Sequence, residues 1–195
     1  MQFREMLNDI CQVSAIQATT ALSKFLQTPV GVYVKPVELT KMKEMTKNED
    51  ESTLNFFLPI MGNLAGVSFF LYTQKAALSL CDIMFKKTDG TTHSIKENEI
   101  SALSEVANIV IGNFLTAFSQ SLQMDFLMHK SAIFEHASFT NTFNERMPVM
   151  IEKMGDEVIK IAFGFHHVNI NGHVVVMFDE ENLNSLLKKI SIISS

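Results

Sequence analysis

The sequence predicts an α/β protein in which long helices pack on one side of an antiparallel sheet. Segments whose apolar residues recur every three or four positions alternate with short runs rich in Val, Ile and Phe. This order of segments, a helix, a strand, two further strands and a helix, occurs twice along the chain. With 195 residues, of which 47% are hydrophobic, the chain is long and apolar enough to form one compact domain from two similar halves.

The first half, residues 1–87, begins with a predicted helix. Residues 30–39 (VGVYVKPVEL) alternate in polarity and predict a strand, and the charge-rich residues 41–52 predict an exposed connection. LNFFLPIM and GVSFFLYT predict two strands joined by a turn at Gly62 and Asn63, and KAALSLCDIMFKK predicts a second helix. The apolar stripe predicted for the first helix consists of Met6, Ile10, Val13, Ala18, Ala21, Leu22 and Phe25.

Residues 88–94 (TDGTTHS) are polar, contain an Asp-Gly pair and predict a linker, after which the second half begins at residue 95. The long helix of this half, residues 95–195, is predicted from about Glu97 to Leu122. Ser94 is its expected N-cap, with Glu97 in the capping-box position. The apolar stripe of this helix consists of Leu103, Val106, Val110, Phe114, Leu115 and Phe118.

Three strands and a helix complete the second half. Residues 127–138 predict the first strand, and VIKIAFGFHH and HVVVMF predict two more, joined by a turn at Asn169–Gly172. EENLNSLLKKI predicts the last helix. Residues 143–154 stay ambiguous, because Pro148 would interrupt a helix there.

Composition and patterning argue against several functions. The net charge of −5 and the absence of a Lys or Arg run argue against nucleic-acid binding. Residues 54–74 carry no charge, but Asn, Pro and Gly interrupt them, which predicts a buried hairpin rather than membrane insertion. Cys11 and Cys81 lie in apolar segments, where free Cys behaves as a small hydrophobic residue, and a disulfide between them is possible but less favoured. With no signal-peptide pattern at the N-terminus, we expect a cytoplasmic protein.

A polar stripe runs along the second long helix, opposite its apolar stripe. At 100° per residue, an acid, a carboxamide and several small residues share one narrow face. A glycine in the middle of a helix costs about 1 kcal/mol relative to alanine, which suggests that something approaches the backbone there. From spacing alone, a solvated surface and a binding face both stay possible. The stripe consists of Ser101, Glu105, Asn108, Gly112, Thr116 and Ser119.

The segment SALSEVANIVIGNFLTAFS resembles the signature helix of the CheC/CheX/FliY family of chemotaxis phosphatases. Ser101, Glu105 and Asn108 match the three signature positions, and Gly112-Asn113 matches the usual Gly-Asn of the family. LNDICQVSAIQATTALSKFLQTPV resembles the other copy of the helix, and MGNLAGVSFFLYTQKAALSLCDIM extends the resemblance to nearly the whole chain. The chain departs from the family in lacking a proline between Asn108 and Pro148.

The resemblance implies a CheC-like α/β fold with two pseudo-symmetric α-β-β-β-α halves, an antiparallel sheet and long helices packed on it. It also implies an enzyme that hydrolyses the aspartyl phosphate of a CheY-like response regulator. Asn108 would orient the attacking water, Glu105 would pair with a lysine of the partner, and Ser101 and Gly112 would contribute to docking. The enzyme would have no cofactor of its own, and Mg²⁺ would be held by the regulator.

The first half is expected to carry a degenerate second site. ALSKFL in the first half matches AFSQSL in the second half. This match aligns Asp9 with Glu105, Gln12 with Asn108 and Ile16 with Gly112. Asp is one methylene shorter than Glu and Gln one longer than Asn, so we expect this site to be inactive. The main alternative is a non-catalytic protein of the same fold, either an adaptor for CheD or a component of the flagellar switch. The six histidines show no metal-ligand spacing, and no metal site is expected.

Overall fold

The computed structural model describes residues 2–41, 44, 53–128, 133–137, 157–166 and 170–193. Within these ranges the helices are α1 (Gln2–Leu26), α3 (Gln74–Met84), α4 (Glu97–Leu122) and α7 (Glu180–Ile193). The strands are β1 (Gly31–Val34), β2 (Glu38–Lys41), β3 (Thr53–Gly62), β4 (Gly66–Thr73), β5 (Phe126–Met128), β6 (Ile133–Ala137), β7 (Glu157–His166) and β8 (Ile170–Phe178).

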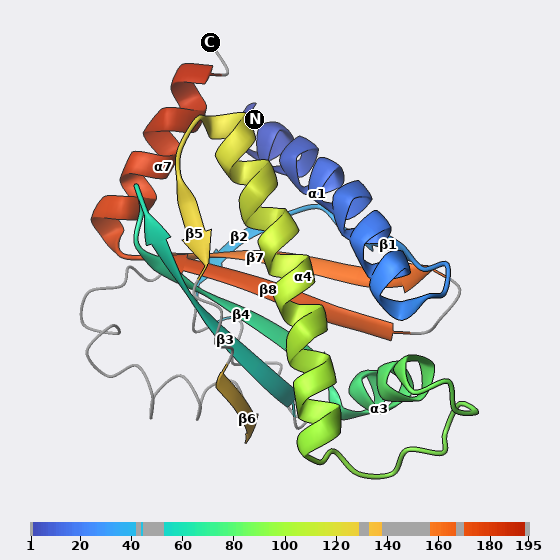
Figure 1. Cartoon of the computed structure of the whole chain (residues 1–195). Helices are drawn as coiled ribbons and strands as arrows, with labels where there is room; N and C mark the ends of the chain where they lie inside the picture. The colour runs from blue at the N-terminus through green and yellow to red at the C-terminus, as the bar shows by residue number, and fades with distance from the viewer. Residues whose placement is uncertain are drawn as a thin grey trace.

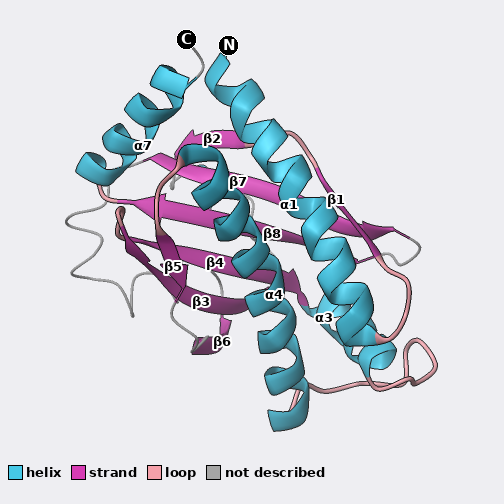
Figure 2. Ribbon diagram, turned by 45° about the horizontal axis from the view of Figure 1, so that its top comes forward, coloured by secondary structure: helices cyan, strands magenta, loops and turns pink. Residues whose placement is uncertain are grey.

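The described strands form one eight-stranded antiparallel sheet in the order β1-β7-β8-β4-β3-β5, with β2 also paired to β7 and β6 to β3. Figure 1 shows α1 and α4 side by side across one face of this sheet. Figure 2 shows the same layering from a second direction, with α7 beside the two long helices. The predicted α/β fold with an antiparallel sheet and long helices packed on it is therefore confirmed.

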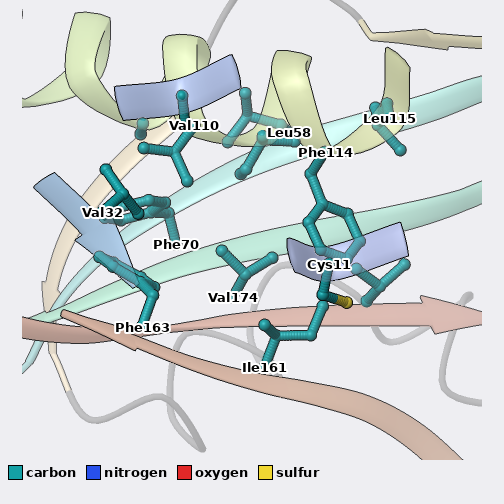
Figure 3. Packing of buried hydrophobic residues seen from close by; sticks show 14 of the residues in the cluster. Cys11, Val32, Leu58, Phe70, Val110, Phe114, Leu115, Ile161, Phe163 and Val174 are labelled. Carbon is teal, nitrogen blue, oxygen red and sulfur yellow. The ribbon is translucent and has the colours of Figure 1, made fainter. Parts of the chain in front are cut away.

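The main core lies between this face of the sheet and the helices. All four described helices contribute buried side chains to it. In Figure 3, Val110 and Phe114 of α4 lie above Phe70 of β4 and Val174 of β8, and Cys11 reaches the same layer from α1. A smaller apolar cluster occupies the opposite face of the sheet and contains Val67, Phe69, Leu71, Val158, Val175 and Met177.

The uncharged segment 54–74 forms the β3–β4 hairpin, as predicted, with pairing from Thr53 opposite Thr73 to Ile60 opposite Gly66. Gly62 has φ 122°, and a Cβ there would collide with the Asp125 carbonyl, so the turn requires glycine. By length and composition α4 could cross a membrane, but it places ten apolar side chains against the core. A core helix passes the same test, so this is weak evidence for a membrane span.

The two predicted halves share this sheet. Strands β1 and β2 follow α1 in the sequence but pair with β7, and β5 and β6 follow α4 but pair with β3. The central contact is between β4 and β8, one strand from each half. The internal duplication itself stays a prediction, and the exchange of strands is what we expect of two halves related by a pseudo-twofold axis.

The two long helices also end in the same way. The Ser23 hydroxyl accepts a hydrogen bond from the Val30 N–H at 3.1 Å, and the Ser119 hydroxyl accepts one from the Phe126 N–H at 3.1 Å. In each case the helix is followed by a residue in the left-handed conformation, which turns the chain toward the next strand. These residues are Gln27 (φ 51°) and Gln123 (φ 50°).

Several element boundaries differ from the prediction. The strand predicted over residues 30–39 is divided into β1 and β2, because Pro36 has no N–H to donate to β7. Residues 170–172, predicted as part of a turn, belong to β8 and pair with β7. The strand predicted over 127–138 consists of β5 and β6. The ambiguous residues 143–154, and most of the charge-rich connection 41–52, lie outside the described residues.

The cap predicted for α4 is also wrong. Lys96 is the N-cap residue, two positions after Ser94, and its backbone N–H donates to the Glu99 carboxylate at 3.1 Å. α4 begins after Lys96 because the loop before it is held by a side chain of α3. Asp82 of α3 is buried and accepts hydrogen bonds from the Gly90 N–H at 2.7 Å and the Thr92 N–H at 2.9 Å.

The stripe predicted for α1 is correct only in part. Val13 and Phe25 are exposed, at 46% and 41% of their surface, although both were predicted to be buried. The inner face instead includes Cys11 and Ala15, and α1 packs along α4. Among the α1 residues whose burial the structure describes, the buried apolar ones are Leu7, Ile10, Cys11, Ala15, Ala18, Leu22 and Leu26.

Candidate functional site

The polar stripe of α4 lies on the outer side of the helix, as the periodicity predicts. Ser101, Glu105 and Thr116 are exposed, and Asn108, Gly112 and Ser119 are half-buried. The apolar residues on the opposite side of α4 are buried against the sheet and the other helices. The outer side of α4 therefore exposes Ser101, Glu105 and Thr116 to solvent, with Asn108 and Gly112 partly exposed between them.

Asn108 has an unsatisfied carboxamide. Its Oδ1 is buried and has no hydrogen-bond partner. Leaving such a group unpaired costs about 1–3 kcal/mol, and most buried polar atoms in folded proteins avoid that cost. Its Nδ2 is not among the buried unpaired atoms, so the two ends of the amide differ in their access to solvent. The described fold gives this side chain no structural partner.

Glu105, one helical turn before Asn108, is exposed and makes no ion pair or hydrogen bond with another described side chain. A carboxylate that is not engaged within its own protein can receive a cation from another. Charge-assisted hydrogen bonds of that kind are about twice as strong as neutral ones.

Gly112, one turn after Asn108, is not required by packing. A Cβ built on it would meet only the Met128 methyl group, at 3.7 Å, which is ordinary van der Waals contact. Its φ is not in the left-handed region that favours glycine. Because glycine in a helix costs about 1 kcal/mol relative to alanine, its presence here is unexplained by the fold and leaves the backbone accessible.

Two side chains bind helix carbonyls around this glycine. Asn113 Nδ2 donates to the Ile109 carbonyl at 2.7 Å, and Thr116 Oγ1 donates to the Gly112 carbonyl at 2.8 Å. In the sequence Asn113 matches the Gly-Asn of the family pattern, which implies no role for it. A carboxamide directly after a glycine in mid-helix was the available signal, because Asn can bond to the carbonyl four residues earlier.

The corresponding face of α1 has a different character. Asp9 and Gln12 are exposed, so both members of the predicted degenerate pair lie on the outer side of the helix. Gln12 Nε2, however, is directed to the Val34 carbonyl at 3.5 Å, a long hydrogen bond within the chain. Ile16, in the place of Gly112, is 68% exposed, and Val13 beside it is 46% exposed. This face is apolar and bulky where that of α4 is small.

Side chains of α1 also cover the outer edge of strand β1, which ends the described strand order. Thr19 Oγ1 accepts the Val32 N–H at 2.8 Å, and Ser23 Oγ both donates to and accepts from the Val30 backbone at 2.9 and 3.1 Å. Alternate residues of an edge strand direct their backbone groups away from the sheet, and these contacts satisfy them. Gln12 extends the same row to Val34.

No group of three or more His, Cys, Asp or Glu side chains in the described ranges could hold a metal ion. His129 and His167 lie outside those ranges. Cys11 and Cys81 are free and buried, as predicted. Burial raises the pKa of the Cys81 thiol to about 12 and raises the pKa of Cys11 as well, so both behave as core residues.

A family model described as the CheC-like family matches residues 99–133, which include nearly all of α4 and strand β5. The matched segment contains Ser101, Glu105, Asn108 and Gly112. This segment of the chain is similar to the CheC-like family. The model match and the fold together confirm the resemblance seen in the sequence, although the match does not extend to the face of α1.

Solved structures of similar fold cover most of the chain. It is 16% identical to FliY from Thermotoga maritima, covering 98% of this chain and 96% of that one with a TM-score of 0.72. A chain of the FliG–FliM complex from H. pylori is 12% identical, with 96% and 97% covered and a TM-score of 0.70. A chain of the CheX–CheY–BeF3–Mg²⁺ complex from Borrelia burgdorferi is 16% identical, with 86% and 96% covered and a TM-score of 0.56.

Proposed function

We propose that this CheC-like protein hydrolyses the aspartyl phosphate of a CheY-like response regulator. The observation that carries the proposal is the unpartnered carboxamide of Asn108, which lies on the outer face of α4 between an unpaired acid and a glycine that packing does not require. Groups that a fold leaves unsatisfied or unexplained are concentrated at functional sites.

In this proposal Asn108 enters the active site of the regulator and hydrogen-bonds a water in line with phosphorus. The water oxygen forms a bond to phosphorus while the bond from phosphorus to the aspartyl oxygen breaks, which yields phosphate and a free carboxylate. An amide does not act as a general base near neutral pH, so its contribution is orientation of the nucleophile. Phosphoryl transfer requires mainly positioning and charge stabilisation, which two side chains on a rigid helix can supply.

Glu105 fixes the register of the two proteins by pairing with a lysine of the regulator. Ser101 extends the contact by one helical turn, and Gly112 lets the partner approach the backbone on the other side of Asn108. The Mg²⁺ that neutralises charge on the phosphoryl group would be held by the regulator, and the CheX–CheY–BeF3–Mg²⁺ complex contains this ion. Both proteins would act in the cytoplasm, a reducing compartment that suits two free cysteines.

A second candidate function is a non-catalytic component of the flagellar switch. FliY and the FliG–FliM complex match more of this chain, at higher TM-scores, than the CheX-containing complex does. The partner would then be another switch protein, or CheD in an adaptor role, and Glu105 and Asn108 would not be needed. The apolar face of α1, with Ile16 68% exposed, favours a docking role of this kind for at least one side of the molecule.

The two functions are separated by mixing the protein with a panel of phosphorylated CheY-like regulators from one organism and following phosphate release. The phosphatase proposal predicts faster release for at least one regulator, and predicts that Glu105→Ala and Asn108→Ala abolish the acceleration. The matched control is the Asp9→Ala/Gln12→Ala double variant, which should keep full activity. If no regulator loses phosphate faster, the proposal is wrong and the switch component is the better assignment.

A further inference from the structure

The middle of α4 combines a weak point with two reinforcing contacts. In a helix the Gly112 N–H donates to the carbonyl of Asn108, so the turn that carries the candidate amide is closed by the residue with the greatest backbone freedom. The carbonyls of Ile109 and Gly112 each accept an additional hydrogen bond, from Asn113 Nδ2 at 2.7 Å and from Thr116 Oγ1 at 2.8 Å. Ile109 directly follows Asn108, and Gly112 closes the turn, so both additional hydrogen bonds are made within the turn that glycine loosens.

We propose that Asn113 is a positioning residue that fixes the turn carrying Asn108. This inference rests on the proposed function, because it assigns a role in orienting the candidate water-positioning amide. Asn113 is half-buried and its amide is committed to the Ile109 carbonyl, so it acts on the helix and not on the phosphoryl group. Gly112 gives the partner access to the backbone but leaves this turn of the helix more flexible. The hydrogen bond from Asn113 to the Ile109 carbonyl holds the turn in place.

The corresponding turn of α1 lacks this contact. Thr20 Oγ1 donates to the Ile16 carbonyl at 3.3 Å, so the counterpart of the Thr116 contact is present. Gln17 occupies the position of Asn113 but makes no hydrogen bond to the carbonyl four residues earlier, and its Oε1 is buried without a partner. With Ile16 in place of glycine, that turn has no loosened backbone to hold. The Asn113 contact therefore occurs where a glycine and an unpartnered amide occur together.

A role in helix stability and a role in positioning Asn108 predict opposite effects of substitutions at Asn113. Alanine is the better helix former but cannot donate to the Ile109 carbonyl. Serine is a poorer helix former but can donate to it, as Ser191 does to the Leu187 carbonyl at 3.0 Å in α7. If Asn113 only stabilised the helix, Asn113→Ala would be neutral or favourable. If it positions Asn108, Asn113→Ser should be the active variant and Asn113→Ala the impaired one.

The first measurement is phosphate release from the phosphorylated regulator under saturating and limiting concentrations. We expect Asn113→Ala to lower kcat about tenfold with KM changed less than about twofold, since small misplacements of a reacting group cost rate rather than binding. Asn113→Ser should recover kcat to within about threefold of the natural protein. Ser191→Ala, which removes the same type of contact from α7, should leave kcat unchanged. Equal kcat values for the alanine and serine variants would overturn the proposal.

The second measurement needs no phosphatase activity. The side-chain amide signals of Asn108 are followed by NMR in the free protein, with those of Gln12 as an internal reference. We expect the Asn108 signals to move in Asn113→Ala and to return in Asn113→Ser, while the Gln12 signals stay in place. An inactive natural protein would contradict the proposed function alone. Unmoved Asn108 signals in Asn113→Ala would contradict the positioning role, whatever the activity.

Discussion

The outer faces of α1 and α4 use similar residue types for different purposes. On α4 the acid is unpaired, the amide has no partner and a glycine leaves space. On α1 the amide of Gln12 is directed to the backbone of β1, and Ile16 fills the position of the glycine. An acid–amide pair on a helix face is therefore a candidate site only where the fold provides no hydrogen-bond partner for the amide.

The largest effect is expected when Asn108 of α4 is replaced by glutamine, the residue at the corresponding position of α1. Asn108→Gln moves the carboxamide outward by one methylene, and we expect phosphate release to fall by about 10²-fold, because a displacement near 1 Å can cost that much. The reverse change, Gln12→Asn, should leave the rate unchanged. Stopped-flow measurement of regulator dephosphorylation tests both. If both substitutions lowered the rate equally, the proposed difference between the outer faces of α1 and α4 would be wrong.

A smaller effect, on stability, is expected at the α1–β1 contact. Thr19→Val keeps the shape of the side chain but removes the acceptor for the Val32 N–H. Leaving that N–H unpaired should lower the free energy of unfolding by about 1–3 kcal/mol, measured by urea denaturation, with no change in the rate of phosphate release. If phosphate release fell in parallel with stability, α1 would contribute to the activity as well as to the fold.

Gly112→Ala is expected to separate stability from function on α4. The added Cβ would meet only the Met128 methyl group at 3.7 Å, so the change should raise the free energy of unfolding by about 1 kcal/mol. Affinity for the regulator, measured by isothermal titration calorimetry, should fall because the partner loses its approach to the backbone. An unchanged affinity would show that the glycine has no docking role.

The smallest expected effect is on the free energy of unfolding and occurs only at acidic pH. The hydrogen bonds from Thr92, Thr91 and Gly90 hold the pKa of Asp82 below its ordinary value. A carboxyl group with a lowered pKa contributes stability above its unfolded pKa, and that contribution is lost as the pH falls through its folded pKa. The difference in unfolding free energy between the natural protein and Asp82→Asn should therefore be constant near neutral pH and shrink below about pH 4. A difference independent of pH would contradict the assignment.

Much of α4 could be predicted because local signals agree with one another. Its apolar stripe is regular, its charged first turn is near the observed start, and both predicted ends coincide with the observed helix. The outer face of α1 could not be predicted from the same rules. Val13 and Phe25 are apolar in the sequence but lie outside, because a helical period fits more than one set of apolar positions and packing against the rest of the fold decides which set is buried.

The candidate site was also only partly accessible from the sequence. Periodicity brought Glu105, Asn108 and Gly112 to one face, and the structure agrees with that arrangement. The unpaired state of Asn108 and the commitment of Gln12 to Val34 depend on segments distant in the sequence, so no local pattern contains them. The cap at Lys96 was missed for the same reason, since Asp82 fixes the loop before it.

The exchange of strands between the halves has a consequence for how the chain is made. Gly31 pairs with His166, so strand β1 cannot pair with β7 until most of the polypeptide has been synthesised. Pairings across such sequence distances are slow to form, and unpaired strand edges are prone to aggregate in the meantime. The hydroxyl groups of Thr19 and Ser23, which bind β1 from the adjacent helix, are available to that strand as soon as it emerges. These contacts cover the edge of β1 in the folded protein. They are therefore also suited to protect β1 of the nascent chain from pairing with a strand of another molecule.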